Sequence, residues 1–188
     1  MGDMKNTIKG ISINLFYKKG YFATSISDIA REAGIQKSSI YYHYSNKEEI
    51  LFDILKTTMV DLDENLEAQI KDVQDAEKKM RAAIQSHVIF HMERQKEVII
   101  SDSELRGLTV DNYRNIMKMM DTYERKFQSL IKEGIEKGVF ADMDFKVASY
   151  GVITMCTAVS IWFNQSGRLS KEDVARIYTD FLIHGLKG

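Results

Sequence analysis

The chain has 188 residues, no proline and a single cysteine, and its formal net charge is −1. The absence of proline and the abundance of Lys, Glu, Ile, Leu and Met favour an all-helical protein. Residues 1–47 carry seven Lys or Arg against three Asp or Glu, a net +4, which leaves −5 for the remainder. A basic N-terminal segment on an acidic body indicates a polyanionic partner for that segment alone.

The cysteine count and the hydropathy pattern argue against a disulfide-stabilised secreted protein and against a membrane-spanning protein. One cysteine, Cys156, cannot form an intramolecular disulfide, and no signal peptide opens the sequence, so we expect a cytoplasmic protein. The uncharged run 147–167 contains Ser, Thr, Asn and Gln and is too polar for a membrane span.

The first helices are predicted from apolar spacing and capping residues. A helix over residues 7–18 should end at Gly20. Ser25 followed by Asp28 has the pattern of a capping box, which predicts a helix from residue 26 to residue 33, with Gly34 as the turn. A third helix is expected over residues 37–44. Two short helices joined through a glycine are typical of a helix-turn-helix, whose second helix enters the DNA major groove.

At least five further helices are predicted in the body, and we expect an all-α chain of about nine helices. Ser45 with Glu48 marks the start of a long fourth helix that runs toward residues 72–75. The segment 98–108 has no clear pattern. The other helices are expected over residues 76–95, 110–137, 144–164 and 170–186. We therefore expect a DNA-binding domain over residues 1–47 and an effector-binding and dimerisation domain over residues 48–188.

The N-terminal quarter resembles the tetracycline-repressor (TetR) family of transcriptional regulators. The cap, the turn, the tyrosine pair and the next helix start fall in register over about 45 residues. The matching residues are Leu15-Phe16, Gly20-Tyr21, Thr24-Ser25-Ile26, Asp28-Ile29-Ala30, Ala33-Gly34-Ile35, Ser39-Ile40-Tyr41-Tyr42-His43-Tyr44 and Lys47-Glu48-Glu49-Ile50-Leu51. The resemblance implies a ligand-responsive regulator, and not an enzyme, that binds double-stranded operator DNA.

The predicted DNA-binding residues divide into two groups. Lys37 and Ser38 open the recognition helix, and the resemblance adds Ser39, Tyr41, Tyr42 and His43 to that surface. Thr24, Ser25 and Lys47 should contact the flanking phosphates. Alternatively, one of the two tyrosines packs inside the domain.

A homodimer formed through the last two helices is expected, because the helix over residues 145–163 is apolar on nearly all sides. A partner subunit would cover one of its faces in a four-helix bundle, and a palindromic operator would follow. The alternative is that this second face lines a cavity.

The resemblance also implies an apolar effector pocket, which methionine and aromatic side chains suit. The alternative for each such side chain is ordinary core packing. The segment 104–108 is similar to family members that bind acyl-coenzyme A thioesters, with Arg106 near the head group. The predicted effector-binding residues are Phe90, Met92, Arg106, Met117, Met120, Tyr123, Phe127, Met155 and Trp162.

Other functions have weaker support in the sequence. His87 and His91 share a helix face with no third ligand nearby, so packing or pocket lining is favoured over a metal site. No cofactor is expected, and no catalytic motif is visible. The alternatives are a multidrug-responsive repressor of an efflux pump and a helical interaction protein that does not bind DNA. The fourth helix is predicted to transmit effector binding as a rigid lever.

Overall fold

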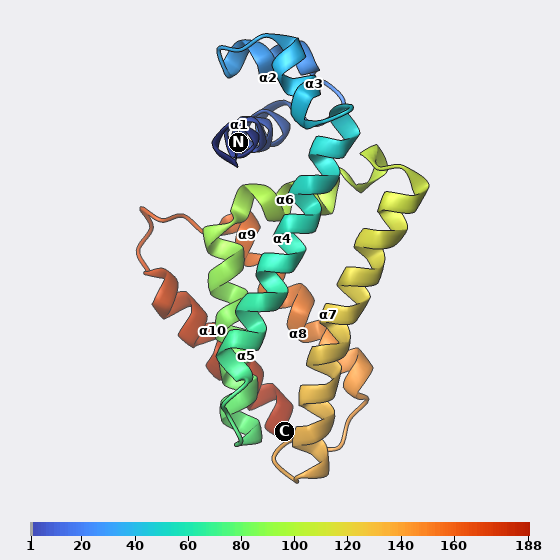
Figure 1. Ribbon diagram of the computed structural model, residues 1–188. Coiled ribbons are helices and arrows are strands. Elements are labelled where there is room, and N and C mark those ends of the chain that lie inside the picture. Colours follow the sequence, from blue (N-terminus) through green and yellow to red (C-terminus); the bar gives the residue numbers. More distant parts are fainter. Residues whose placement is uncertain (1) are drawn as a thin grey trace. The chain divides into compact units, whose positions relative to one another are not determined.

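The computed structural model describes residues 2–188, with side chains from Met4 onward, and every regular element in that range is helical. The predicted all-α fold is confirmed (Figure 1). The elements are α1 (Gly2–Lys19), α2 (Ile26–Glu32), α3 (Lys37–His43), α4 (Lys47–Ile70), α5 (Ala76–Glu93), α6 (Gln95–Ser103), η1 (Leu105–Gly107), α7 (Val110–Glu136), α8 (Phe145–Thr157), α9 (Val159–Trp162) and α10 (Lys171–Lys187).

The structure differs from the predicted elements at three places. Helix α1 begins five residues before the predicted start. The unassigned segment 98–108 forms most of α6 and the short 3₁₀ turn η1. The helix expected over residues 144–164 is divided at Ala158 into α8 and α9.

The predicted caps are confirmed at α2 and α10. Ser25 accepts a hydrogen bond from the Asp28 amide, and the Asp28 carboxylate accepts one from the Ser25 amide, which completes the capping box. Ser170 accepts from the Asp173 amide in the same way. At α4 the prediction was one residue early, because Asn46 and not Ser45 accepts from an amide three residues later, that of Glu49, at 2.9 Å.

Backbone contacts divide the chain into two compact units, Met1–Met59 with Lys96–Met117 and Val60–Gln95 with Lys118–Gly188. Helices α4 and α7 each contribute residues to both units. The first unit therefore contains α6 from Lys96 onward, η1 and the start of α7 as well as the predicted helix-turn-helix segment. The boundary predicted at residue 47 remains a prediction.

In the first unit, Gly107 of η1 lies against the side chains of Tyr21, in the loop between α1 and α2, and of Leu51 in α4. A methyl group at this position would lie 2.6 Å from two ring carbons of Tyr21 and 2.9 Å from a methyl carbon of Leu51. Both side chains are buried, and the Tyr21 ring packs edge-on against Phe16 at 5.3 Å, so neither can move aside easily. The absence of a side chain at Gly107 allows η1 to approach this closely.

Gly107→Ala is expected to lower the free energy of unfolding by about 1–3 kcal/mol, as overpacking does elsewhere. The measurement is urea denaturation followed by circular dichroism. Gly10→Ala is the matched control, because Gly10 lies inside α1 with no atom near an added methyl group. The control should gain about 0.5–1 kcal/mol from helix propensity. A gain at Gly107 as well would show that η1 is not closely packed.

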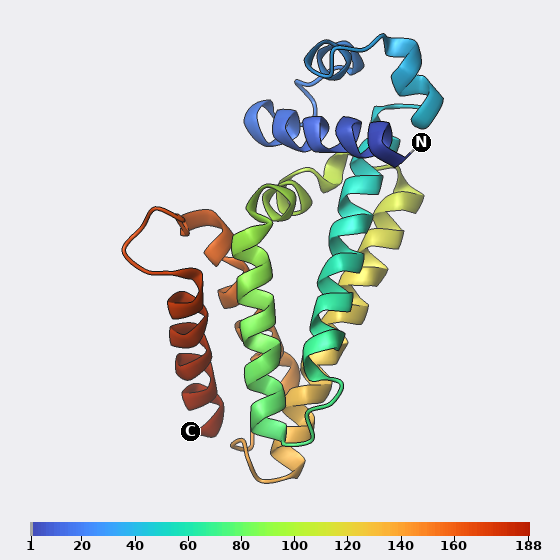
Figure 2. The ribbon, with the colours of Figure 1, turned by 60° about the vertical axis from the view of Figure 1, so that its left-hand side comes forward.

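In the second unit, α5 is the central helix and contacts α8, α9 and α10. Figure 2 shows α10 running alongside α5, as it does in Figure 1. Helix α5 is buried along most of its length, with Met80, Ile84 and Val88 fully enclosed. The core of this unit also includes Phe127 and Ile131 of α7.

Candidate DNA-binding and effector sites

The turn between α2 and α3 is built as the sequence predicts. Gly34 has φ +65°, a conformation that residues with a side chain rarely adopt. The Ile35 amide then donates to the Ala30 carbonyl at 3.0 Å, which directs the chain into α3. Ile40 and Tyr44 are buried, so the opposite side of α3 faces outward.

The outward side of α3 carries the predicted base-reading residues. Lys37 and Ser38 are exposed, and Tyr41 and Tyr42 are 53% and 69% exposed. Both tyrosines therefore face outward, against the alternative that one of them packs inside the domain. Ser39 and His43 are half-buried. A hollow of about 410 Å³ is bordered by Met4, Ser38, Ser39, Tyr42 and His43.

The residues predicted to contact flanking phosphates make hydrogen bonds inside the unit. The Thr24 side chain is 1% exposed, and its hydroxyl donates to the Gly20 carbonyl at 2.9 Å. The Lys47 ammonium donates to the carbonyls of Tyr21 and Thr24 at 2.8 and 2.7 Å, and burial lowers its pKa. Ser25 caps α2. Thr24 and Lys47 thus hold the loop before α2 in place, and their predicted contact with DNA remains untested.

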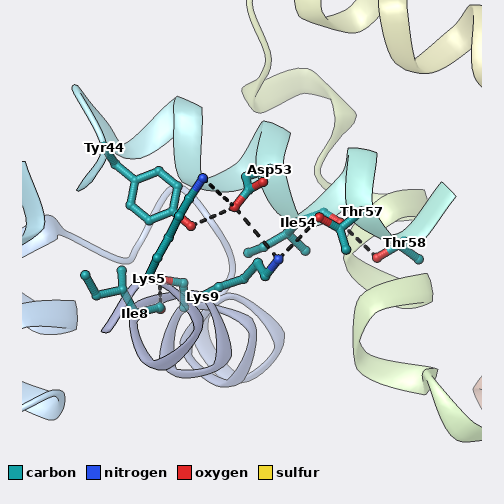
Figure 3. Close-up of polar contacts among 9 residues, drawn as sticks. Lys5, Ile8, Lys9, Tyr44, Asp53, Ile54, Thr57 and Thr58 are labelled. Atoms are coloured by element: carbon teal, nitrogen blue, oxygen red, sulfur yellow. Dashed lines mark hydrogen bonds and ion pairs between the residues drawn. The ribbon is translucent and has the colours of Figure 1, made fainter. Parts of the chain in front are cut away.

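A cluster around Asp53 was not predicted from the sequence. The Tyr44 hydroxyl donates to the Asp53 carboxylate at 2.7 Å, and the Lys5 and Lys9 ammonium groups lie 3.6 and 3.9 Å from the same oxygen (Figure 3). Burial, and secondly the hydrogen bond to Asp53, raise the pKa of Tyr44. Only the folded contacts among α1, α3 and α4 bring these side chains together, so periodicity gave no signal of them.

The structure separates the nine predicted effector-binding residues. Phe90, Met92, Tyr123 and Phe127 are buried in the second unit, and Met120 of that unit is partly exposed. Met155 and Trp162 belong to the same unit but lie on its surface, 37% and 52% exposed. Arg106 and Met117 belong to the first unit.

Three of the buried members, Phe90, Tyr123 and Phe127, contact a polar group centred on His87 and His91. The His87 Nδ1 lies 2.9 Å from the Tyr123 hydroxyl, and its Nε2 lies 3.1 Å from the Thr157 hydroxyl. His91 stacks on His87 with ring centroids 3.9 Å apart, and Phe127 meets His87 edge-on. These side chains come from α5, α7 and α8. We call His87, His91, Tyr123 and Thr157 the histidine cluster.

The hydrogen positions in the histidine cluster follow from its partners. The His91 Nδ1 lies 2.8 Å from the His87 carbonyl, which can only accept, so this nitrogen carries the hydrogen. The His91 Nε2 then accepts from Thr157 across a long 3.5 Å contact. Thr157 in turn accepts from the His87 Nε2, which leaves the His87 Nδ1 to accept from Tyr123. With both imidazoles neutral, every donor in the cluster has an acceptor.

Burial favours this neutral state. It lowers the pKa of His87 well below its ordinary value, and the neighbouring His91 adds to the effect. Burial lowers the pKa of His91 to about 4, partly offset by its hydrogen bond to the His87 carbonyl. Unfolded histidine has a pKa of about 6.5. Between pH 6.5 and 4 the unfolded chain therefore binds protons that the folded chain does not.

Stability should consequently fall as the pH drops below 6.5, by up to about 1.4 kcal/mol per pH unit for each of the two histidines. Urea denaturation at pH 7.5 and at pH 5 measures this loss. His91→Asn keeps an N–H donor near the position of Nδ1 but has no titrating group. The free energy of unfolding of this variant should therefore fall less between pH 7.5 and pH 5 than that of the wild-type chain. Equal losses in the two proteins would contradict the neutral, buried assignment of His91.

Phe90 also lines a separate cavity of the second unit, of about 260 Å³. Its other lining residues are mostly polar, and the volume is below the range of about 300–1,000 Å³ usual for small-molecule sites. These other lining residues are Asn65, Gln69, Ala82, Gln85, Ser86, Ile89 and Glu93.

In the part of the chain that the structure describes, no group of three or more His, Cys, Asp or Glu is placed to hold a metal ion.

Seven large apolar side chains of α8, α9 and α10 are exposed, and we call them the outer apolar face. Ile161 and Phe181 are the most prominent, at 78% and 63%. The segment Phe145–Trp162 is long and apolar enough to cross a membrane, but a single segment of this kind is weak evidence for a membrane-spanning helix. The outer apolar face consists of Val147, Tyr150, Met155, Ile161, Trp162, Ile177 and Phe181.

The turn at Gly34 and the exposed polar side of α3 define a helix-turn-helix DNA-binding protein. The chain belongs to the tetracycline-repressor family. The family model for the tetracyclin repressor-like C-terminal domain matches residues 73–186, and the model for bacterial regulatory proteins of the tetR family matches residues 12–54. The family consists of transcription regulators.

Individual relatives are distant in sequence but similar over almost the whole chain. The fatty acid metabolism regulator protein of Bacillus subtilis (strain 168) is 23% identical over 177 residues, covering 93% of this chain and 91% of the relative. The ketosteroid transcriptional regulator KstR2 of Mycobacterium tuberculosis shares the fold with a TM-score of 0.91 at 19% identity, covering 98% and 95%. AibR, solved with isovaleryl coenzyme A and operator DNA, has a TM-score of 0.85 at 23% identity, covering 97% of each chain.

Proposed function

We propose that this chain is a cytoplasmic homodimeric repressor whose binding to a palindromic operator responds to an apolar small molecule, with acyl-coenzyme A thioesters as the leading candidates. Membership of the tetracycline-repressor family supports the regulator class. The observation that carries the DNA-binding role is the exposed side of α3, with Lys37, Ser38, Tyr41 and Tyr42 directed outward. The Lys37 ammonium group and the serine and tyrosine hydroxyls of α3 can form hydrogen bonds with the donors and acceptors that base pairs present in the major groove.

The outer apolar face supports the homodimer. An exposed apolar surface of this kind marks an interaction site in soluble proteins. Two copies of α8 and α10 would bury it in a four-helix bundle and fix two recognition helices at one spacing. That spacing would select half-sites about one turn of DNA apart.

The histidine cluster is the proposed polar element of the effector site. Its hydroxyl and imidazole groups lie among buried apolar side chains, an arrangement that fits a ligand with an apolar body and one polar function, such as a thioester carbonyl. His87 and Tyr123 are almost fully buried. An effector could reach them only if α5, α7 and α8 separated, so binding would favour a different helix arrangement. We propose that α4, continuous from Lys47 to Ile70, transmits that change.

Two of the relatives support acyl-coenzyme A thioesters as the effector class. One relative is named for fatty acid metabolism, and the AibR structure contains isovaleryl coenzyme A. Isothermal titration calorimetry with short, medium and long acyl-coenzyme A, free coenzyme A and the free fatty acids tests this choice. We expect binding of at least one thioester and none of free coenzyme A. Binding of an unrelated apolar drug, with no binding of any thioester, would contradict the choice and favour a multidrug-responsive repressor.

Tyr123→Phe is expected to weaken effector binding about five- to tenfold, because it removes the hydroxyl that donates a hydrogen bond to the His87 Nδ1 and so disturbs the proposed polar element of the effector site. Calorimetry with the best-binding thioester measures the loss. Operator affinity without effector should be unchanged, since the variant keeps the aromatic ring. Unchanged effector affinity in Tyr123→Phe would place the effector elsewhere in the second unit.

A further inference from the structure

The Asp53 carboxylate is the common partner of Tyr44, which follows α3, and of two lysines of α1. One of its oxygens accepts a hydrogen bond from the Tyr44 hydroxyl and lies within 4 Å of the ammonium groups of Lys5 and Lys9. Lys9 also donates to the Thr57 hydroxyl at 3.3 Å, one turn further along α4. Figure 3 shows both lysines reaching from α1 toward this carboxylate. The cluster therefore joins α1, α4 and the residue that follows α3.

Tyr44 connects this cluster to the recognition helix. It is the C-cap of α3, and its amide donates to the Ile40 carbonyl at 2.9 Å. Its ring is 1% exposed, and the Lys5 ammonium lies over the ring at 5.0 Å from the centroid. A displacement of the Tyr44 side chain would move the end of α3 with it. The outward residues of α3, from Lys37 to His43, would change their direction accordingly.

We propose that Asp53 is a positioning residue for operator recognition: without touching DNA, it fixes the C-terminal end of α3 through Tyr44 and anchors that end to α1. The proposal rests on the proposed binding of operator DNA by α3. A purely structural salt bridge would affect stability alone. A positioning residue affects the ratio of operator affinity to affinity for other DNA, because contacts with bases require an accurately placed helix and phosphate attraction does not.

Simple electrostatics predicts the opposite result for Asp53. Replacing this carboxylate by an amide removes one negative charge next to the basic segment 1–47, and it also leaves Lys5 and Lys9 without their carboxylate partner. Both changes favour phosphate contacts and should strengthen binding to DNA of any sequence. The two explanations therefore predict opposite signs for operator affinity in Asp53→Asn.

The test compares Asp53→Asn, Tyr44→Phe and the double variant in the full chain. Fluorescence anisotropy measures binding to the operator recovered from a random duplex pool and to a scrambled duplex, at one salt concentration. For Asp53→Asn we expect operator affinity to fall about tenfold while affinity for the scrambled duplex stays constant or rises. Tyr44→Phe should show a similar loss on the operator without a change on the scrambled duplex. The double variant should lose little more than the larger single loss, because both changes act on the same hydrogen bond: Asp53→Asn leaves only a weaker, uncharged acceptor for the Tyr44 hydroxyl, and Tyr44→Phe removes the donor.

Asp111→Asn is the matched charge control. Its side chain is 90% exposed, lies in the same unit and forms an ion pair with the nearby Arg114. It should leave the operator preference unchanged. If Asp53→Asn strengthens binding to both duplexes as a simple charge change would, the proposal is overturned. Wild-type operator affinity in Tyr44→Phe would overturn it as well, and this variant keeps the ring that the fold needs. If the wild-type chain selects no duplex at all, the DNA-binding function itself fails.

Discussion

Replacing Ile161 and Phe181 together with glutamate is expected to produce a folded monomer whose operator affinity is at least about 100-fold lower. Both side chains are largely exposed on the outer apolar face, so glutamate is tolerated in a single subunit. In the proposed dimer, the carboxylates would be buried without partners and close to their symmetry copies, at a cost that exceeds the lost apolar contact. A monomer carries one recognition helix and makes half of the operator contacts.

Sedimentation equilibrium gives the mass of the double variant, and fluorescence anisotropy gives its operator affinity. The matched control is Val110→Glu, which introduces glutamate at an apolar side chain that is 65% exposed but lies outside the outer apolar face. The control should remain dimeric and bind the operator normally. A dimeric Ile161→Glu, Phe181→Glu protein would show that subunits meet through another surface.

Lys37→Ala is expected to weaken operator binding by about 1–3 kcal/mol per half-site and to relax the preference at one base pair of each half-site. Lys37 is exposed in the first turn of α3, where recognition helices approach base edges most closely. A lysine that donates to guanine acceptors contributes discrimination of this size. Affinity for non-specific DNA should fall much less, because a single phosphate contact at most is lost.

Binding to operators with each base pair changed in turn gives the measurement for Lys37. Lys18→Ala is the control, because Lys18 is an exposed lysine at the end of α1, outside the recognition helix. Any loss of DNA affinity in Lys18→Ala should be similar for every DNA sequence and should disappear in high salt. A uniform loss for Lys37→Ala too would make Lys37 a phosphate contact, and the bases would then be read by Ser38, Ser39 or Tyr42.

The local features of the helix-turn-helix could be predicted from the sequence. The capping box at Ser25 and the positive φ at Gly34 depend on residues close together in the chain, and both are confirmed. The burial of Ile40 and Tyr44 and the exposure of Tyr41 and Tyr42 show which side of α3 faces outward. Predicting the cap of α4 was harder, because Ser45 and Asn46 are both suitable caps and only their backbone positions distinguish them.

Features that depend on contacts between distant segments could not be predicted. Met155 and Trp162 are predicted for the effector site because methionine and aromatic side chains suit an apolar pocket, but their spacing alone does not show which side of the helix is covered, and both lie on the surface. The pairing of His87 with Tyr123 and Thr157 needs three helices in place. The Asp53 cluster likewise needs α1 and α4 in contact.

Operator recognition by a dimer is tested most directly by selecting bound duplexes from a random pool with the purified chain and sequencing them. We expect one enriched palindrome with half-sites about one helical turn apart, and loss of that enrichment in the Ile161→Glu, Phe181→Glu protein. An enriched sequence without two-fold symmetry would contradict the proposed dimer, and the absence of any enrichment would contradict operator recognition by α3.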